Sequence, residues 1–235
     1  MANSWFQFKQ FRVEQDRCPL KVGTDACLLG AWSQADSPSR ILDIGTGTGL
    51  LALMLAQRYT APILALEPDA QSAAQARENF ASSPWPDRLQ LLETRVQELK
   101  ADTPFDLIVC NPPFYPHHLK AADARRNQAL HQETLSFAEL ASACSRLLSP
   151  TGLCYILLPP RQAEEFERVA SACGLLPQRK LLIRERPGSP IHRTVGGYGK
   201  GVKQEIQEEV LEIRDAAGAY SAAFRRLLKS YYLIF

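Results

Sequence analysis

The chain of 235 residues lacks several patterns that would place it in a specialised class of protein. Its six cysteines form no Cys-x-x-Cys pair and no metal-ligand spacing, which argues against a zinc site and a disulfide framework. No apolar run reaches the ~18 residues that a membrane-spanning helix needs, and residues 1–5 do not resemble a signal peptide. We therefore expect a cytoplasmic protein with reduced cysteines, without metal, membrane contact or an obligate protein partner.

An excess of one charge is also missing. The formal net charge is +2, so composition neither favours nor excludes nucleic acid, and any basic surface must be local. The chain shows no internal repeat and no low-complexity tract, and its length suits one α/β domain with appendages. We expect an N-terminal arm or hairpin with a short helix over residues 1–39, and one main domain over residues 40–235.

Strand-like and helix-like stretches alternate through most of the chain. Expected strands lie at residues 40–44, 63–66, 89–92, 105–110 and 153–158, and expected helices at 50–58, 69–81, 137–148 and 161–173. Segments 178–184 and 208–214 have no long helix between them, so we expect an antiparallel hairpin at one sheet edge, followed by a last helix near 220–230. The sequence predicts an α/β fold with a doubly wound, mostly parallel, seven-stranded, Rossmann-like sheet.

A glycine-rich turn links the first of these strands to the first helix. Gly45, Gly47 and Gly49 permit positive φ angles and let backbone amides approach a ligand at the helix N-terminus. Glu67 ends the next strand, where a carboxylate can accept hydrogen bonds from ribose hydroxyls. The turn predicts a nucleoside cofactor but also fits a dinucleotide fingerprint. Asp43, just before the turn, favours a ligand with an ammonium group and no pyrophosphate, such as S-adenosylmethionine.

A second motif follows the strand at 105–110: Asn111, Pro112, Pro113 and Phe114. Two prolines fix the backbone, so the Asn111 side chain and the Pro112 carbonyl form a preorganised pair of acceptors. Such a pair can bind both N–H groups of an exocyclic amine and stabilise the positive charge that grows as the nitrogen is methylated. Phe114 offers a flat face on which a base can stack. The motif predicts methylation of a planar amine or amide nitrogen.

Together these motifs resemble class I S-adenosylmethionine-dependent amino-methyltransferases. Residues 6–11, 16–25 and 28–32, with 51–58, 83–85 and the C-terminal segment, more closely resemble the bacterial tRNA1(Val) adenosine-37 N6-methyltransferases, over nearly the whole chain. The resemblance implies a tRNA partner, target contacts at Asn111 and Pro112, and cofactor contacts at nine positions. These are Lys21, Thr24, Asp25, Asp43, Gly45, Gly47, Gly49, Glu67 and Asn111, with Glu93 as a possible substitute contact to the adenine.

One position departs from this family. Relatives usually carry an acidic residue after the third strand that binds the cofactor's adenine amine, and here Arg95 occupies that position. The adenine contact is therefore expected from Glu93 or from a backbone group.

Basic residues gather in two later segments. Arg125 and Arg126 follow the Asn111 motif, and a glycine-rich stretch between residues 179 and 203 is expected to be a loop that joins two strands. Such a loop can bind phosphates or merely be solvated. The RNA-binding residues expected here are Arg184, Arg186, Arg193, Lys200 and Lys203.

Other functions use part of this pattern. A protein glutamine N5-methyltransferase or an rRNA amino-methyltransferase would use the same catalytic turn. A NAD-dependent oxidoreductase would use the glycine turn but leave residues 111–114 unexplained, and a non-catalytic RNA-binding module would need neither motif intact.

Overall fold

The computed structural model describes residues 3–112, 135–201 and 205–235. It begins with β1 (Trp5–Gln7), β2 (Arg12–Glu14) and α1 (Thr24–Trp32). The central part contains β3 (Ile41–Ile44), α2 (Leu50–Arg58), β4 (Ile63–Leu66), α3 (Ala70–Ala81), a 3-10 turn (Pro86–Arg88), β5 (Leu89–Leu92) and β6 (Phe105–Cys110). The last part contains α5 (Phe137–Leu147), β7 (Leu148–Leu158), α6 (Pro160–Ala172), β8 (Leu176–Arg184), β9 (Ile191–Gly199), β10 (Gln207–Glu212) and α7 (Ala222–Leu228).

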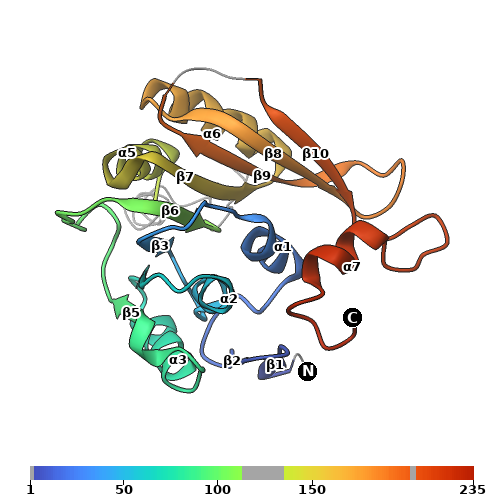
Figure 1. Ribbon diagram of the computed structural model, residues 1–235, viewed down its shortest axis with the longest axis horizontal. Helices are drawn as coiled ribbons and strands as arrows, with labels where there is room; N and C mark the ends of the chain where they lie inside the picture. Colours follow the sequence, from blue (N-terminus) through green and yellow to red (C-terminus); the bar gives the residue numbers. More distant parts are fainter. Residues whose placement is uncertain (1–2, 113–134, 202–204) are drawn as a thin grey trace, which may run out of the picture.

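The main sheet follows the order β10-β8-β9-β7-β6-β3-β4-β5 (Figure 1). The pairs from β7 through β6, β3 and β4 to β5 are parallel, whereas β9 runs antiparallel to both of its neighbours, β7 and β8. The doubly wound, mostly parallel sheet that the sequence predicts is therefore confirmed. Among the described residues this sheet has eight strands instead of seven.

The extra strand is β9, which replaces the expected glycine-rich loop. Glycine is unusual inside strands, so the sequence pattern favoured a loop. In the fold Gly197 lies opposite Tyr155 on β7, and a Cβ at Gly197 would come within 2.8 Å of that ring. The large buried ring thus fills the space that a side chain on β9 would take. As a result β8 has β9 as its antiparallel partner, and its pairing with β10 is parallel, not antiparallel as expected.

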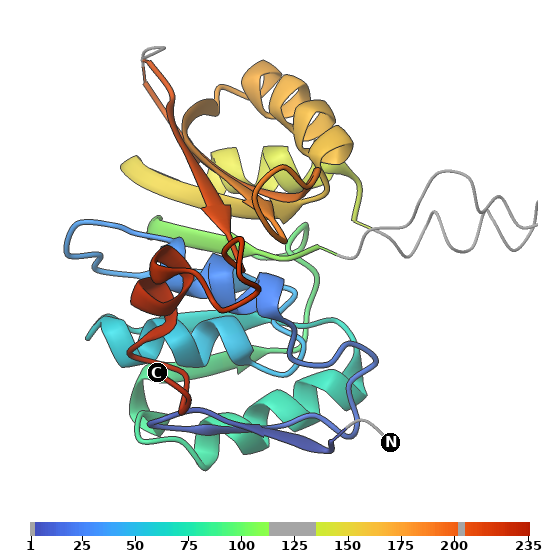
Figure 2. The same cartoon turned by 90° about the vertical axis from the view of Figure 1, so that its right-hand side faces the viewer.

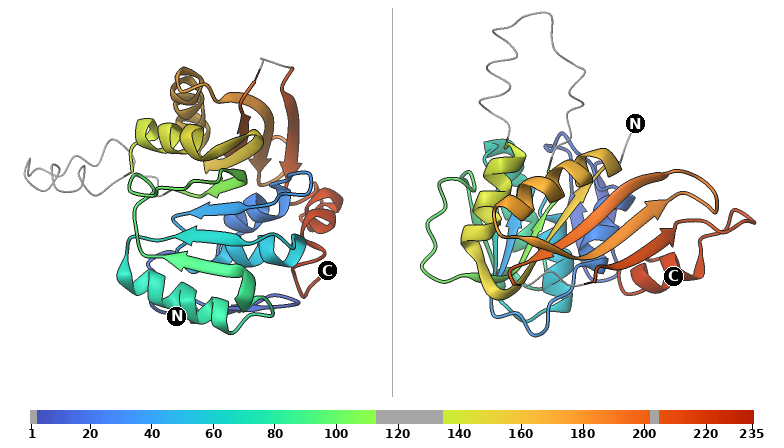
Figure 3. Two further views of the ribbon diagram at one scale, coloured as in Figure 1. Left: turned by 60° about the vertical axis from the view of Figure 1, so that its left-hand side comes forward. Right: turned by 90° about the horizontal axis from the view of Figure 1, so that it is seen from above.

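The two faces of the sheet carry separate apolar layers. Tyr155 and Leu157 on β7 pack in the cluster that contains α1, α2 and α7, and Cys154 and Ile156 pack in the cluster that contains α5 and α6. This alternation follows from the two-residue period of a strand. The views in Figures 2 and 3 show the helices on both sides of the sheet.

The N-terminal segment forms the expected short hairpin, with β1 antiparallel to β2. It is held by aromatic packing: the rings of Phe8 and Phe11 stack with centroids 4.5 Å apart, and Phe6 contacts Tyr232 near the C-terminus. The Lys9 amide also donates to the Tyr231 carbonyl over 2.8 Å. The two chain termini therefore lie on the same side of the molecule (Figure 1).

The described residues contain neither a membrane-spanning helix nor a metal-ligand cluster. In the described part of the chain no helix is long and apolar enough to cross a membrane. Within the same residues no group of three or more His, Cys, Asp or Glu side chains could hold a metal ion. The described cysteines form no disulfide.

Candidate functional site

The motif residues meet because three neighbouring strands end together. Ile44 at the end of β3 pairs with Leu66 of β4 on one side and with Cys110 of β6 on the other. The segments that follow these strands therefore leave the sheet at the same edge, which we call the carboxyl edge. In a doubly wound sheet ligands bind outside this edge.

The glycine turn adopts the conformation that its sequence predicts. Gly45, Gly47 and Gly49 have φ angles of +70°, +55° and +84°, in the left-handed region that other residues avoid. A Cβ at Gly45 or Gly47 would meet no atom within 4 Å, whereas a Cβ at Gly49 would meet the Phe80 ring at 2.5 Å. The first two glycines thus border open space suited to a ligand, and the third allows α2 and α3 to pack closely.

Asp43, in β3, is hydrogen-bonded to the glycine turn and is fully buried. Its Oδ2 atom accepts hydrogen bonds from the Thr46 hydroxyl over 2.5 Å and from the Ala52 amide over 3.1 Å. Its Oδ1 atom is buried and has no hydrogen-bond partner. Burial raises the pKa of Asp43 to about 7, although the two hydrogen bonds oppose that shift. A cationic group on a ligand would stabilise the ionised form.

Glu67 directly follows β4, and its carboxylate accepts hydrogen bonds from two backbone amides. Its Oε2 atom accepts from the Gly47 amide over 2.8 Å and its Oε1 atom from the Asp69 amide over 3.0 Å. Burial raises the pKa of this carboxyl group, and both amide hydrogen bonds act in the opposite direction. The carboxylate is therefore fixed beside the glycine turn, where a ribose would lie.

These groups fit a positively charged nucleoside cofactor. The open glycines leave room for its backbone contacts, and the orphaned Oδ1 of Asp43 is a buried acceptor with an unmet hydrogen-bonding capacity. The Glu67 carboxylate oxygens each have a further lone pair that can accept a hydrogen bond from a hydroxyl group.

Asn111 lies directly after β6, one strand from the glycine turn. It is half-buried, and its Oδ1 atom is buried without a hydrogen-bond partner. Pro112 behind it is buried. An unpaired buried acceptor costs free energy, so this oxygen is suited to accept a hydrogen bond from a substrate. Pro113 and Phe114 lie outside the described residues.

The segment between the hairpin and α1 crosses the carboxyl edge. Lys21 donates to the carbonyls of Gln15 and Cys18. Burial raises the pKa of the Cys18 thiol, which lies close enough to Glu67 for its charge to act in the same direction. Lys21 therefore lies on the same side of the carboxyl edge as Glu67.

Thr24 and Asp25, at the other end of this segment, have protein partners. The Thr24 side chain lies close enough to the Tyr232 hydroxyl to lower the pKa of that group, although burial raises it overall. The Asp25 carboxylate lies 3.0 Å from Nε of Arg193 and 3.4 Å from Nε2 of His192, both at the start of β9. The structure thus directs Asp25 toward β9.

Asn79 was not predicted as a site residue from the sequence. It lies on α3 and links the glycine turn to the N-terminal hairpin through hydrogen bonds. Its Nδ2 donates to the carbonyls of Thr48 and Glu14 over 2.8 Å each, and its Oδ1 accepts from the Glu14 amide over 2.9 Å. Gln75, four residues earlier on the same helix face, accepts from the Arg17 amide. Buried polar residues spaced like the apolar face of a helix were the available signal.

The expected RNA-binding residues do not lie together. Arg184 pairs with Glu212 over 2.5 Å, and Arg186 is exposed beyond the end of β8. Lys200 lies past the opposite end of β9 from Arg193 and donates to the Leu148 carbonyl over 2.6 Å. Strand geometry separates these two ends by about 20 Å. The remaining members of the set are Arg125, Arg126 and Lys203, which lie outside the described residues.

The segment after β5 contains Glu93 and Arg95, the two residues considered for the adenine contact. Glu93 follows this strand and pairs with Arg77 over 3.3 Å. It is exposed, as is Arg95. A role of Glu93 in binding the cofactor's adenine stays a prediction.

The chain is similar to known proteins over nearly its whole length. The model of the methyltransferase small domain family matches residues 21–137, which include the glycine turn and Asn111. A protein of Bacteroides fragilis named tRNA1(Val) (adenine(37)-N6)-methyltransferase is 44% identical, with 99% of each chain covered. Proteins of the same name from Aeromonas salmonicida and Trichodesmium erythraeum are each 42% identical, with 98% and 99% of each chain covered.

Solved structures support the fold. An Agrobacterium tumefaciens protein described as a predicted O-methyltransferase superposes with a TM-score of 0.65 at 21% identity, over 88% of this chain and 96% of that one. A glycopeptide N-methyltransferase solved with S-adenosylmethionine gives a TM-score of 0.58 at 12% identity, over 78% and 96% of the two chains.

Proposed function

The chain belongs to the tRNA1(Val) (adenine(37)-N6)-methyltransferase family, and from this premise we propose that it methylates N6 of adenosine 37 in the anticodon loop of tRNA1(Val). The methyl donor is S-adenosylmethionine. The observation that carries the proposal is the buried, unpartnered Oδ1 of Asn111, one strand from a glycine turn with two open glycines. We further propose that the reaction takes place in the cytoplasm, without a metal or an obligate protein partner.

The catalytic role of Asn111 follows from the chemistry of the amine. The N6 lone pair of adenine is delocalised into the ring, so the nitrogen is a weak nucleophile. Acceptance of its two N–H groups by Asn111 Oδ1 and the Pro112 carbonyl draws the lone pair out of conjugation and stabilises the developing positive charge. After methyl transfer the nitrogen loses a proton to water, and no dedicated base is needed. Pro113 holds this turn rigid, and Phe114 stacks on the base.

The cofactor would bind at the part of the carboxyl edge formed by the glycine turn and the end of β4. When bound, S-adenosylmethionine supplies an electrophilic methyl group on a sulfonium. Gly45, Gly47 and Gly49 allow its close approach, Asp43 compensates positive charge, and Glu67 accepts from the ribose. Lys21 and Thr24 would border the same space. The family resemblance also assigns Asp25 to the cofactor, but its carboxylate faces Arg193 and His192.

The RNA would approach from the β7–β9–β8 side of Asn111. Arg184, Arg186 and Arg193 lie at the carboxyl edge of these strands, whereas Lys200 lies beyond the opposite edge. Arg125, Arg126 and Lys203 remain part of the proposal on sequence grounds alone. An anticodon loop suits this site because an unpaired base can leave the loop at low cost.

The test is to incubate the protein with labelled S-adenosylmethionine and with unmodified tRNA transcripts, ribosomal RNA and release factors in parallel. Mapping of the labelled product should give N6-methyladenosine at position 37 of tRNA1(Val). The Asn111→Ala variant is the matched control, since it should bind the cofactor without producing label. Label found only in ribosomal RNA or on a protein glutamine would overturn the substrate assignment.

A further inference from the structure

Asp25 connects two distant parts of the chain through a single carboxylate. It lies in the first turn of α1, and its two oxygens face Nε of Arg193 at 3.0 Å and Nε2 of His192 at 3.4 Å. The Arg193 guanidinium also donates through Nη1 to the His192 carbonyl over 2.8 Å. All three side chains are about one-third exposed. Arg193 is thus held in one orientation while it remains accessible from solvent.

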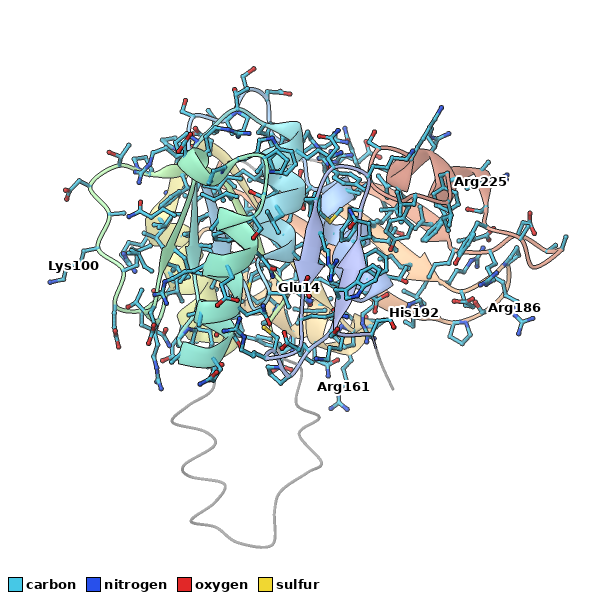
Figure 4. All side chains as sticks on the ribbon, turned by 90° about the horizontal axis from the view of Figure 1, so that it is seen from below. Glu14, Lys100, Arg161, Arg186, His192 and Arg225 are labelled. Carbon is cyan, nitrogen blue, oxygen red and sulfur yellow. The ribbon has the colours of Figure 1, made fainter. Side chains whose placement is uncertain are left out.

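The start of β9 brings this cluster to the carboxyl edge. Leu158, at the end of β7, pairs with Thr194, so His192 and Arg193 continue past the same edge as β7. Ile156 of β7 pairs in turn with Cys110, the residue before Asn111. Figure 4 shows His192 toward the same side of the molecule as Arg161, at the start of α6, while Arg225 of α7 lies toward the opposite side.

We propose that Asp25 is a positioning residue for the RNA substrate, which holds Arg193 so that its guanidinium meets a backbone phosphate next to the target adenosine. The inference rests on the proposed function, because it takes RNA as the substrate. A guanidinium whose orientation is already fixed loses less entropy on binding a phosphate than a free side chain does. Asp25 does not touch the reacting atoms; it acts through Arg193.

The proposal and simple electrostatics predict opposite effects for Asp25→Asn. If Asp25 were only a negative charge near the RNA, its removal would strengthen binding of a polyanion. If Asp25 positions Arg193, its removal takes away one of the contacts that orient the guanidinium and weakens RNA binding despite the gain in net positive charge. The sign of the change in RNA affinity therefore distinguishes a positioning role of Asp25 from a purely electrostatic one.

The experiment measures tRNA affinity and KM, together with the cofactor Kd, for the wild type and three variants. Asp25→Asn should raise the tRNA Kd and KM by about three- to tenfold and change the cofactor Kd by less than about twofold. Asp25→Glu keeps a carboxylate and should regain most of the affinity. The double variant Asp25→Asn/Arg193→Gln should bind tRNA no more weakly than Arg193→Gln alone, because both changes remove one interaction.

A matched control is Glu209→Gln, which breaks another carboxylate–arginine pair, Arg179–Glu209 at 3.1 Å, on strands of the same sheet. It should leave tRNA and cofactor affinities unchanged, and melting curves should show that every variant is folded. Unchanged or tighter tRNA binding by Asp25→Asn would overturn the inference, and so would a weaker cofactor affinity with an unchanged tRNA KM. If the wild type methylates another RNA, the proposed function fails, and the same comparison on that RNA still decides the role of Asp25.

Discussion

The residues assigned to the two ligands lie in different halves of the carboxyl edge. In the half at β3, β4 and β5, which we call the acidic half, the buried carboxylate of Asp43 and the fixed carboxylate of Glu67 border an open glycine turn. In the half at β7, β9 and β8, which we call the basic half, lie the cationic groups Arg161, Arg186 and Arg193, the last of them paired with Asp25. Asn111, with its unpartnered oxygen, follows β6 at the boundary between them.

This division matches the charges of the two proposed ligands. The methyl donor carries a sulfonium and an ammonium group and suits the acidic half, whereas RNA carries phosphates and suits the basic half. One edge of the sheet can serve both ligands because the acidic and the basic residues belong to different strands. The order of the strands alone keeps the two groups of residues apart. The variants below test the two halves and their boundary separately.

The largest effect is expected at the boundary. Asn111→Ala removes the side-chain acceptor and should lower kcat by about 10²- to 10³-fold. The cofactor Kd should change by less than about twofold, because Asn111 acts mainly on the target amine. Single-turnover methylation and equilibrium dialysis measure the two quantities. Near-normal turnover of this variant would show that the acceptor pair is not the catalytic device.

The acidic half should respond to pH through Asp43. The pKa of this carboxyl group is raised to about 7, so cofactor affinity should fall as the pH is lowered from 8 to 6 and Asp43 becomes protonated. Asp43→Asn should weaken cofactor binding about 30-fold or more at pH 8 and remove this pH dependence. Calorimetric titration across this pH range checks both, and a wild-type affinity independent of pH would contradict the role of Asp43.

The same pKa makes a prediction about stability. Because the folded carboxyl group binds its proton more tightly than the unfolded one, lowering the pH from 8 toward 5 should stabilise the cofactor-free protein through this group. In Asp43→Asn this contribution is absent, so the unfolding free energy of the wild type should rise relative to that of the variant as the pH is lowered from 8 toward 5. Denaturant unfolding at several pH values measures the difference.

Two glycines of the glycine turn should respond differently to substitution, because Gly49 packs against Phe80 whereas Gly47 borders open space. Gly49→Ala places a methyl group against Phe80 at a φ of +84° and should destabilise the fold by about 2–4 kcal/mol. Gly47→Ala has no neighbour to clash with and should cost only about 1 kcal/mol, while weakening cofactor binding. Gly188→Ala, at a φ of +78° and exposed, is the control for backbone strain alone. Equal losses of stability at Gly47 and Gly49 would contradict their separate roles.

The smallest effect is expected in the basic half. Arg186→Ala should weaken tRNA binding by about two- to threefold and reduce the slope of affinity against salt concentration by about one. Lys200→Ala, beyond the other end of β9, is the matched control and should leave that slope unchanged. A larger effect of Lys200→Ala would move the RNA to the opposite edge of the sheet.

The elements most accurately predicted were those that local chemistry defines. Buried strands such as β6 and amphipathic helices such as α5 have the expected bounds within a residue or two, since their apolar periodicity depends on neighbours along the chain. The strand β9 was missed because its glycines disfavour a strand until the Tyr155 ring lies over Gly197. That contact joins residues far apart in the chain, and no local pattern reveals it.

The sequence by itself determined the alternating fold, the glycine turn and the Asn111 motif, because each depends on backbone preferences and on the order of a few adjacent residues. Only the tertiary structure decided which residues share an edge. It placed Arg193 at the same edge of the sheet as Asn111 and Lys200 past the opposite end of β9, and it directed Asp25 to Arg193 and His192. Strand direction and strand order produce these relations, and both are set by packing between segments that the sequence keeps apart.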